Sequence, residues 1–124
     1  MKNVISTDKA PGAIGPYSQA IDIGDLIFTS GVIPVDPATG VIPEGVEAQA
    51  DQAFKNLSNL IEAAGSDMSK VVKTTVFIKE MKDFGKINEI YSGYFKEPFP
   101  ARSCVEVARL PKDVLLEIEA ITLK

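Results

Sequence analysis

The sequence contains no histidine and only one cysteine among its 124 residues. The lack of histidine excludes Ser-His and Cys-His nucleophilic centres, ribonucleases with paired histidines, and histidine-ligated zinc sites. A single cysteine cannot form a disulfide within the chain, and the segment Met1–Ser6 lacks the apolar run of a signal peptide. These absences predict a protein of a reducing, cytoplasmic setting.

Long apolar runs and an excess of positive charge are missing as well. No uninterrupted apolar stretch approaches the roughly 20 residues of a membrane-spanning helix, so we expect a soluble protein without a membrane partner. The formal net charge of −4 disfavours a nucleic-acid partner, because phosphate binding needs a basic surface. There is also no phosphate-cradling glycine loop and no ladder of aromatic residues for stacking bases. We therefore expect no nucleic acid and no cofactor.

The composition that is present is that of an ordinary globular domain. Hydrophobic residues make up 45% of the chain and charged residues 24%, which argues against disorder. A chain of this length can bury about two thirds of its unfolded surface in one core. We expect a single domain over residues 1–124.

Two helices are predicted from apolar residues that recur at three- and four-residue steps. The first covers Gly45–Ala64, and Gly65 is suited to end it. The second follows Asp83, a candidate N-cap. Its expected buried face consists of Phe84, Ile87, Ile90, Tyr91, Tyr94 and Phe95. Asn88 falls outside that stripe in this interpretation.

Strands are predicted where β-branched and aromatic residues alternate between turn signals. The first two of the longer strands form a hairpin across Gly24-Asp25, and a constrained loop, Asp8–Ser18, precedes them. The expected strands are Val4–Thr7, Gln19–Ile23, Leu26–Ser30, Lys70–Lys79, Ser103–Ala108 and Val114–Ala120. Strands interrupted by two long helices indicate an α+β fold, with both helices on one face of a mixed sheet. The opposite face is then bare and should find a partner.

The stretch from Pro98 to Glu119 holds the strongest candidates for chemistry. Alternation places Arg102, Cys104 and Glu106 on one face of their strand. A turn at Leu110–Asp113 joins this strand to the last one, so we expect the two strands to be neighbours. We then expect Glu117 of the last strand to share this face together with several apolar residues, and Val105 to lie on the opposite, helix-covered side. A mixed polar and apolar face of that kind suggests a subunit interface with a polar pocket.

Arg102 is the strongest candidate for a binding residue in this stretch. A guanidinium can hold a carboxylate through two parallel hydrogen bonds, which suits an arginine to orient a small acid. The alternative is an arginine at a strand end that lies in solvent or pairs with Glu106. Glu117 and Glu119 share a strand face and could hold a hard cation, but the sequence places no further carboxylate beside them. We therefore assign no metal site.

These residues also carry a resemblance to a known family. The pattern Pro100-x-Arg102-Ser103-x-Val105, followed by Leu116-Glu117-Ile118-Glu119, resembles the signature of the RidA family, also called the YjgF family. The segments Gly15–Ala20 and Ser30-Gly31 resemble the same family's N-terminal motifs. The resemblance extends along nearly the whole chain.

The resemblance implies a chorismate-mutase-like domain that assembles as a homotrimer, with sites in the clefts between subunits. It implies an enamine/imine deaminase that hydrolyses 2-aminoacrylate, 2-iminopropanoate and 2-iminobutanoate to 2-oxo acids and ammonia. In that reaction Arg102 would hold the substrate carboxylate, and Glu117 would orient the attacking water and pass a proton to the departing nitrogen. Cys104 would line the pocket; it is either a pocket residue or a small apolar filler, and no histidine is present to activate it as a nucleophile.

The remaining candidates belong to substrate binding. Tyr17, Ser30 and Gly31 would form a far wall, contributed by a neighbouring subunit, and the resemblance places Asn88 near the pocket. Each has a structural alternative: Tyr17 as a plug over the core edge, Gly31 as a strand end or bulge, and Asn88 as an ordinary helix-surface residue.

The sequence leaves two alternative functions open. One is an RNA-cleaving translation inhibitor, an activity also ascribed to relatives of this family, against which the acidity and the absence of histidine count. The other is a non-enzymatic, chaperone-like module that binds a small carboxylate in the same pocket.

Overall fold

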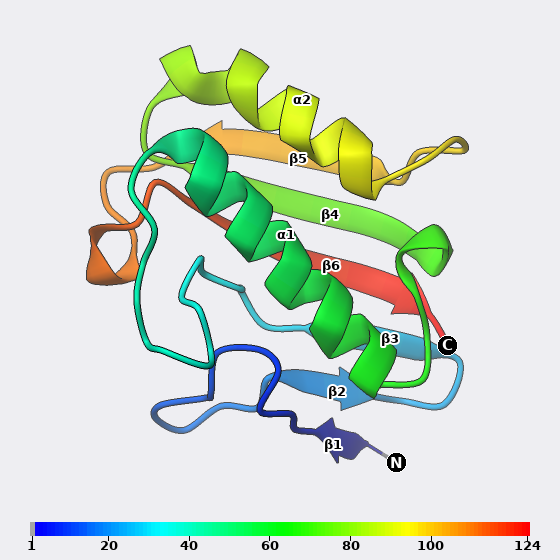
Figure 1. The fold of residues 1–124 in the computed structure, drawn as a ribbon. Helices are drawn as coiled ribbons and strands as arrows, with labels where there is room; N and C mark the ends of the chain where they lie inside the picture. Colours follow the sequence, from blue (N-terminus) through cyan, green and yellow to red (C-terminus); the bar gives the residue numbers. More distant parts are fainter. Residues whose placement is uncertain (1) are drawn as a thin grey trace.

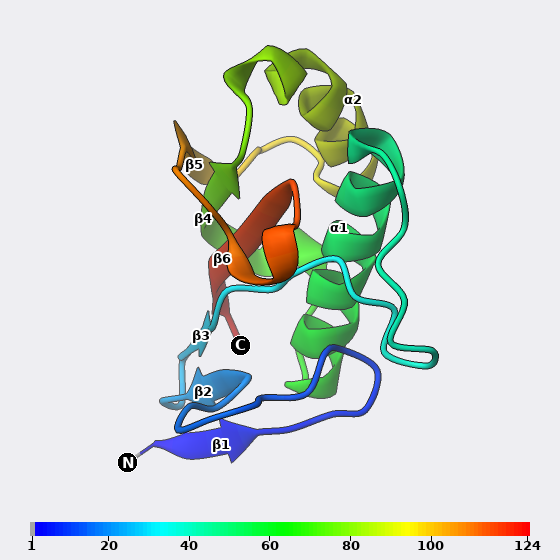
Figure 2. The same ribbon diagram turned by 90° about the vertical axis from the view of Figure 1, so that its left-hand side faces the viewer.

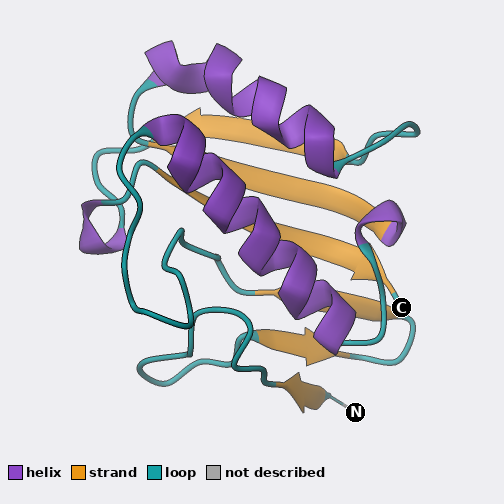
Figure 3. Ribbon diagram, in the orientation of Figure 1, coloured by secondary structure: helices purple, strands orange, loops and turns teal. Residues whose placement is uncertain are grey.

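The apolar patterns of the sequence form six strands and two long helices in the computed structural model, which describes residues 2–124. The strands are β1 (Asn3–Ile5), β2 (Ala20–Asp22), β3 (Leu26–Thr29), β4 (Val71–Ile78), β5 (Ala101–Glu106) and β6 (Leu116–Leu123). The helices are α1 (Val46–Ala63) and α2 (Phe84–Tyr94), and short 3-10 turns span Met68–Lys70, Met81–Asp83 and Pro111–Asp113. Figure 3 colours these elements by type.

The six strands form one mixed sheet in the order β1-β2-β3-β6-β4-β5. The β4–β5 pair is parallel and every other pair is antiparallel, so the predicted α+β fold with a mixed sheet is confirmed. Both helices lie on one face of this sheet (Figure 1), and the view in Figure 2 shows no helix from residues 2–124 on the other face. One face of the sheet is therefore left uncovered, as predicted.

The core lies between the two helices and the covered face of the sheet. Phe54, Leu57 and Ile61 of α1 are fully buried against residues such as Leu116 and Ile118 of β6. Burying each such side chain contributes about 1.5–3 kcal/mol relative to exposing it. The predicted stripe of α2 is confirmed, since Ile87, Tyr91 and Phe95 are buried and Phe84, Ile90 and Tyr94 pack against the same core.

Two local predictions are corrected. Asp83 precedes α2 but makes no capping hydrogen bond with its side chain, because its backbone is already helical in the preceding 3-10 turn. The two C-terminal strands are not neighbours, although a turn joins them: β4 lies between β5 and β6. This arrangement decides which side chains share a face, and it changes the expected site.

Candidate active site

The sheet separates the candidate residues into two groups on opposite faces. Arg102 pairs with Thr74 across β4 and β5, and Thr74 is fully buried beneath α2, where its hydroxyl meets the Tyr91 hydroxyl at 2.8 Å. Arg102 therefore lies on the helix-covered side. Glu117 pairs with Phe77 and alternates with buried Leu116 and Ile118, so it lies on the uncovered face.

The expectation that Arg102, Cys104 and Glu117 share one face is therefore wrong. Cys104 pairs with Val76 and packs against the core, while Val105, expected under the helices, is 43% exposed on the uncovered face. The physical reason is the intervening strand β4, whose register fixes the relative faces of β5 and β6. Within one chain, Arg102 and Glu117 do not face the same space.

The Arg102 group is built by α2 and the edge strand β5. One Arg102 terminal nitrogen donates a hydrogen bond to Asn88 Oδ1 at 2.7 Å. The guanidinium carbon lies 4.7 Å from the centre of the Tyr91 ring and 5.4 Å from that of Phe84. Contacts of this kind hold a cation in place without neutralising its charge.

Arg102 has no carboxylate partner among residues 2–124. The ion pairs of that range are Arg109–Asp113 and Lys124–Asp22. Glu106, the alternative partner weighed from the sequence, instead accepts a hydrogen bond from the Met81 backbone N–H at 2.7 Å. The guanidinium is thus oriented but keeps its charge for another anion.

The structure places Asn88 in direct contact with Arg102 and corrects its position on the helix. Phe84, Asn88 and Tyr91 are spaced four and three residues apart, so they lie on one face of α2. Asn88 belongs to the edge of the buried stripe rather than outside it. Phe84 and Tyr91 were recognised from the sequence only as core residues, and this spacing around Asn88 is the signal that could have identified their contact with Arg102.

Cys104 lies two residues from Arg102 on the same strand face and is partly buried. Burial raises the pKa of its thiol above the ordinary value, and the nearby Arg102 charge lowers it by a smaller amount. A thiol with a raised pKa carries little thiolate at neutral pH and is a poor nucleophile. The environment of Cys104 therefore fits a lining residue.

The Glu117 group lies on the other face, where the chain passes Gly31. The bridge between Val32 and Ile118 brings the segment after β3 alongside β6, with backbone hydrogen bonds of 2.7 and 3.0 Å between the two residues. A Cβ at position 31 would lie 1.8 Å from Glu117 Oε2, a distance at which two atoms overlap. Only glycine leaves room for the carboxylate, so Gly31 here permits a close approach.

Tyr17, Ser30, Gly31 and Glu117 line one hollow of about 290 Å³ together with Ile33 and Pro111. The predicted grouping of Tyr17, Ser30 and Gly31 is thus present in one chain, but Glu117 accompanies it in place of Arg102. The Ser30 hydroxyl donates to the Ser18 carbonyl at 2.6 Å and so fixes the loop that carries Tyr17. Tyr17 itself is 51% exposed at the rim.

The Glu117 carboxyl has a perturbed environment. Burial raises its pKa above the ordinary value, and the like charge of Glu119 raises it further. None of the hydrogen bonds found within residues 2–124 engages this carboxyl. A half-buried carboxyl with a raised pKa holds its proton more readily than an ordinary carboxyl does, which suits it to proton transfer.

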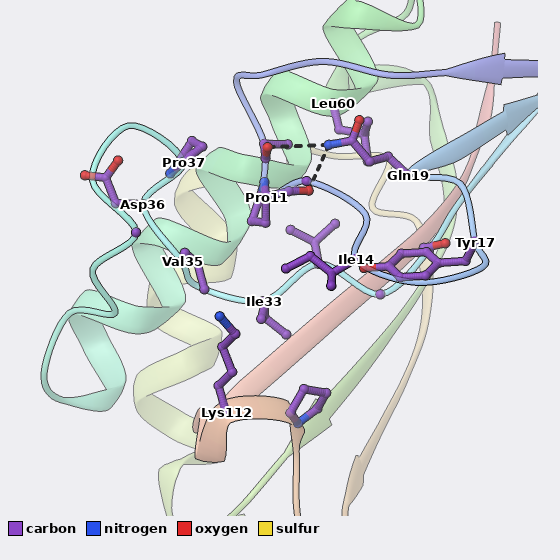
Figure 4. A pocket seen from close by; sticks show the side chains of 17 residues that line it. Pro11, Ile14, Tyr17, Gln19, Ile33, Val35, Asp36, Pro37, Leu60 and Lys112 are labelled. Atoms are coloured by element: carbon purple, nitrogen blue, oxygen red, sulfur yellow. Dashed lines mark hydrogen bonds between the residues drawn. The ribbon is translucent and has the colours of Figure 1, made fainter.

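A second, larger cavity of about 460 Å³ adjoins this hollow and shares Tyr17, Ser30, Gly31, Ile33 and Pro111 with it (Figure 4). Its remaining walls come from the N-terminal loop with Gln19, the segment after β3, Leu60 of α1 and Lys112 of the 3-10 turn. Across residues 2–124 no cluster of three or more His, Cys, Asp or Glu side chains could hold a metal ion. In the same range, no helix has the length and apolar character needed to span a membrane.

Comparison with known proteins relates the whole chain to one family. Residues 7–124 match the family model described as Endoribonuclease L-PSP. The 2-iminobutanoate/2-iminopropanoate deaminase of Salmonella typhimurium is 54% identical, with 100% of this chain and 99% of that protein covered.

Two solved structures agree with this relation. The crystal structure of the Escherichia coli YjgF gene product has a TM-score of 0.94 and 53% identity, with 98% of each chain covered. That of Escherichia coli TdcF with bound serine has a TM-score of 0.94 and 51% identity, also with 98% of each chain covered. The motifs around Arg102 and Glu117, the mixed sheet with two helices on one face, and these full-length similarities lead to one conclusion: the chain belongs to the RidA (YjgF) family, whose model is described as Endoribonuclease L-PSP.

Proposed function

We propose that the protein is a hydrolase that deaminates 2-iminobutanoate, 2-iminopropanoate and the enamines from which they arise, giving 2-oxo acids and ammonia. The observation that carries this proposal is the Arg102 guanidinium, which is held by Asn88 and two aromatic rings and has no carboxylate partner within residues 2–124. Full-length relatives at 54% identity are named for this reaction. Such imines are released by pyridoxal-phosphate dehydratases, and we propose that the protein meets them in the cytoplasm.

Arg102 would bind the carboxylate that every 2-imino acid carries. Its guanidinium offers parallel N–H donors to a planar carboxylate, while Asn88 restrains the side chain before the substrate arrives. A restrained clamp fixes the imine carbon in position and lowers the entropic cost of the reaction. Cys104, two residues along the same strand face, would lie beside that carbon.

We propose that a second copy of the chain supplies the other half of the site. Arg102 and Glu117 lie on opposite faces of one sheet, so a single copy cannot present both to one small acid. The uncovered face that carries Glu117 is also apolar at Phe28 and Val105, which are 37% and 43% exposed. Apolar surface of this kind favours association, and the family resemblance suggests a homotrimer with its sites between subunits.

In the shared site, Glu117 of one copy would work on the substrate held by Arg102 of the next. The imine carbon is already electrophilic, so the enzyme needs only to position a water and move protons. Glu117 would accept a proton from the attacking water as the water oxygen adds to the imine carbon, and would pass this proton to the nitrogen, which gives a carbinolamine. The carbinolamine hydroxyl would then lose its proton to the nitrogen through the same carboxylate while the C–N bond breaks, so that a 2-oxo acid and ammonia are released. The raised pKa of Glu117 favours this exchange.

The residues around Glu117 would complete the far wall. Tyr17 and Ser30 line the hollow, and Gly31 allows the carboxylate to lie against the backbone. We propose that this wall bounds the substrate side chain. No step of this proposal requires a metal or a cofactor.

The name of the family model supports a second candidate, an endoribonuclease. A strand-cleaving site usually relies on histidine acid/base pairs or bound metals, and the chain has no histidine and a net charge of −4. A binder of small carboxylates without catalysis is the remaining alternative. Both can be separated from the deaminase by one set of assays.

The test uses a threonine dehydratase to generate the imine and follows its decay to 2-oxobutanoate with and without the protein. Arg102→Met should lower kcat/KM by at least about 100-fold, because a charge-assisted clamp is lost. Arg109→Met is the matched control: Arg109 is the chain's other arginine, and it pairs with Asp113 on an exposed surface, where an ion pair contributes little. This control should retain wild-type activity.

The outcomes distinguish the three functions. No acceleration of imine decay by the wild-type protein would refute the deaminase. RNA cleavage that persists in Arg102→Met would support the endoribonuclease. Binding of 2-oxobutanoate without ammonia release would support the non-enzymatic binder.

A further inference from the structure

A pair of buried hydroxyl groups lies beside Arg102 and has no part in the reaction as proposed. Thr74 of β4 is fully buried and Tyr91 of α2 is 6% exposed, and their hydroxyl oxygens are 2.8 Å apart. Neither hydroxyl has another hydrogen-bond partner within residues 2–124. Because a buried hydroxyl without a partner costs free energy, each of the two needs the other.

Thr74 is the polar exception among the covered residues at its end of β4. It is followed on the same face by Val76 and Ile78, which are apolar and just as deeply buried. Valine in place of Thr74 and phenylalanine in place of Tyr91 would fill the same space, and removing both partners of a buried hydrogen bond in this way is close to neutral for stability. The hydroxyl pair therefore indicates a role other than stabilising the core.

The pair connects the three elements that surround the Arg102 side chain. Thr74 is the direct neighbour of Arg102 in the parallel pairing of β4 with β5. Its hydroxyl meets that of Tyr91 on α2, and the Tyr91 ring lies 4.7 Å from the guanidinium carbon of Arg102. Thr74, Tyr91 and Arg102 thus form a closed set of contacts that joins β4, α2 and β5.

The Tyr91 ring restrains a motion of the guanidinium that Asn88 leaves open. Asn88 accepts a hydrogen bond from one terminal nitrogen of Arg102, and a guanidinium held at a single nitrogen can still turn about that bond. An aromatic face beside the guanidinium restrains its plane. Two parallel hydrogen bonds to a carboxylate require this plane to be correct. The ring is itself held by Phe95, which stacks on it at 4.2 Å, and at its hydroxyl by Thr74.

The Tyr91 hydroxyl stays neutral in this arrangement. Burial raises the pKa of Tyr91 above the ordinary value, and the hydrogen bond with Thr74 and the charge of Arg102 lower it by smaller amounts. A neutral phenol supports the guanidinium without forming an ion pair with it. The positive charge of Arg102 therefore remains available to a carboxylate.

We propose that Thr74 is a positioning residue of the deaminase: through the Tyr91 hydroxyl it fixes the ring beside the Arg102 guanidinium, and so sets the plane in which the substrate carboxylate is bound. This inference rests on the proposed function, in which Arg102 binds the carboxylate of a 2-imino acid. Thr74 is fully buried and acts through Tyr91 rather than on the substrate. Without its hydroxyl, Arg102 keeps its charge but is more mobile, so substrate binding must also order the side chain.

The kinetic test is Thr74→Val, which removes the hydroxyl and keeps the branched shape. In the dehydratase-coupled assay it should raise KM about 3- to 10-fold, which is the cost of ordering one long side chain on binding. It should change kcat by less than about threefold, because the bound carboxylate itself orders Arg102 before the reaction.

Thr122→Val is the matched control for this variant. Thr122 is also a fully buried threonine on the covered face, and its hydroxyl lies 3.4 Å from that of Ser66. It belongs to β6, which is two strands away from β5. Thr122→Val should lower the urea midpoint of unfolding as Thr74→Val does, and it should keep the wild-type KM.

A second measurement follows the mobility of the guanidinium directly. The chain has two arginines, Arg102 and Arg109, so the arginine Nε–Hε region of the NMR spectrum of the labelled protein contains two signals. The order parameter of Arg102 should be near the rigid value of about 0.85 in the wild type and should fall toward about 0.6 in Thr74→Val. Tyr91→Phe, which keeps the ring and removes only its hydroxyl, should produce the same fall. The signal of Arg109, which pairs with Asp113, should not change.

The double variant Thr74→Val/Tyr91→Phe separates positioning from stability. It leaves no unpaired hydroxyl, so it should unfold at nearly the urea concentration of the wild type at equal protein concentration. It should nevertheless keep the raised KM and the mobile Arg102 of the single variants. A KM that returns to the wild-type value together with stability would show that the pair serves the core alone and would overturn the proposal.

The remaining outcomes separate this inference from the proposed function. Equal KM values and equal Arg102 order parameters in Thr74→Val and Thr122→Val would overturn the role of Thr74 while leaving the deaminase in place. A wild-type protein that does not accelerate imine decay would refute the proposed function. In that case a fall of the Arg102 order parameter in Thr74→Val would still support the positioning of the guanidinium by Thr74, and an unchanged order parameter would overturn it.

Discussion

Substitution of Gly31 tests the position of the Glu117 carboxylate in the proposed site. In Gly31→Ala the added Cβ would lie 1.8 Å from Glu117 Oε2 and 2.6 Å from Cδ, whereas ordinary contact begins at 3.4 Å. The carboxylate must therefore retreat by about 1.6 Å. A displacement of about 1 Å in a catalytic group can cost about 100-fold in rate, so we expect kcat for imine hydrolysis to fall by at least that factor.

Stability should respond much less than activity to this change. The clashing atoms belong to the end of a flexible side chain on the uncovered face, and rotation of that side chain relieves the overlap. The free energy of unfolding, measured by urea denaturation, should fall by about 1 kcal/mol or less.

A matched control is Gly93→Ala on the exposed surface of α2, where a Cβ meets nothing within 4 Å. It should leave kcat unchanged and stabilise the helix by about 0.5–1 kcal/mol. An undiminished kcat in Gly31→Ala would refute the role given to the position of Glu117.

Two further predictions concern the titrating groups of the site. Cys104→Ser should retain imine hydrolysis within about tenfold, because burial raises the pKa of the thiol and leaves little thiolate; a loss of more than about 1,000-fold in kcat would indicate covalent chemistry instead. Glu117→Gln should abolish activity yet unfold at higher urea concentration than the wild type at pH 7 and equal protein concentration. The pKa of Glu117 is raised in the folded state, so its charge costs stability as the pH rises from the unfolded-state value through the folded-state value, and the difference from Gln should vanish below about pH 4. A variant no more stable than the wild type at pH 7 would contradict this assignment.

The elements of the fold could be predicted from local patterns because those patterns are set by local geometry. The stripe from Val46 to Ala63 makes a helix whatever lies beside it, and Gly24-Asp25 makes a hairpin turn from its own conformational preferences. The uncovered face of the sheet could be predicted because the sequence indicated only two long helices, and both were expected to pack on the same face.

The relative faces of Arg102 and Glu117 could not be predicted in the same way. Alternation shows which residues of one strand share a face, but relating two strands requires their register. The turn at Pro111–Asp113 suggested that β5 and β6 were paired, whereas β4 lies between them, parallel to one and antiparallel to the other. Such long-range pairing depends on the whole sheet.

The contact between Arg102 and Asn88 could be predicted from the sequence only in part. Helical spacing relates Asn88 to Phe84 and Tyr91, yet only the packing of α2 over β5 brings these residues to Arg102. The close approach of Glu117 to Gly31 likewise depends on the bridge between Val32 and Ile118, which joins residues far apart in the sequence.

The proposal that each site takes Arg102 from one copy and Glu117 from another is tested most directly by complementation. Arg102→Met and Glu117→Gln should each be inactive alone. When the two variants are unfolded and refolded together in equal amounts, a ring with head-to-tail contacts should regain about one quarter of wild-type activity, because about one site in four then combines an intact Arg102 with an intact Glu117. No recovery in mixed assemblies that form normally would contradict a site shared between copies.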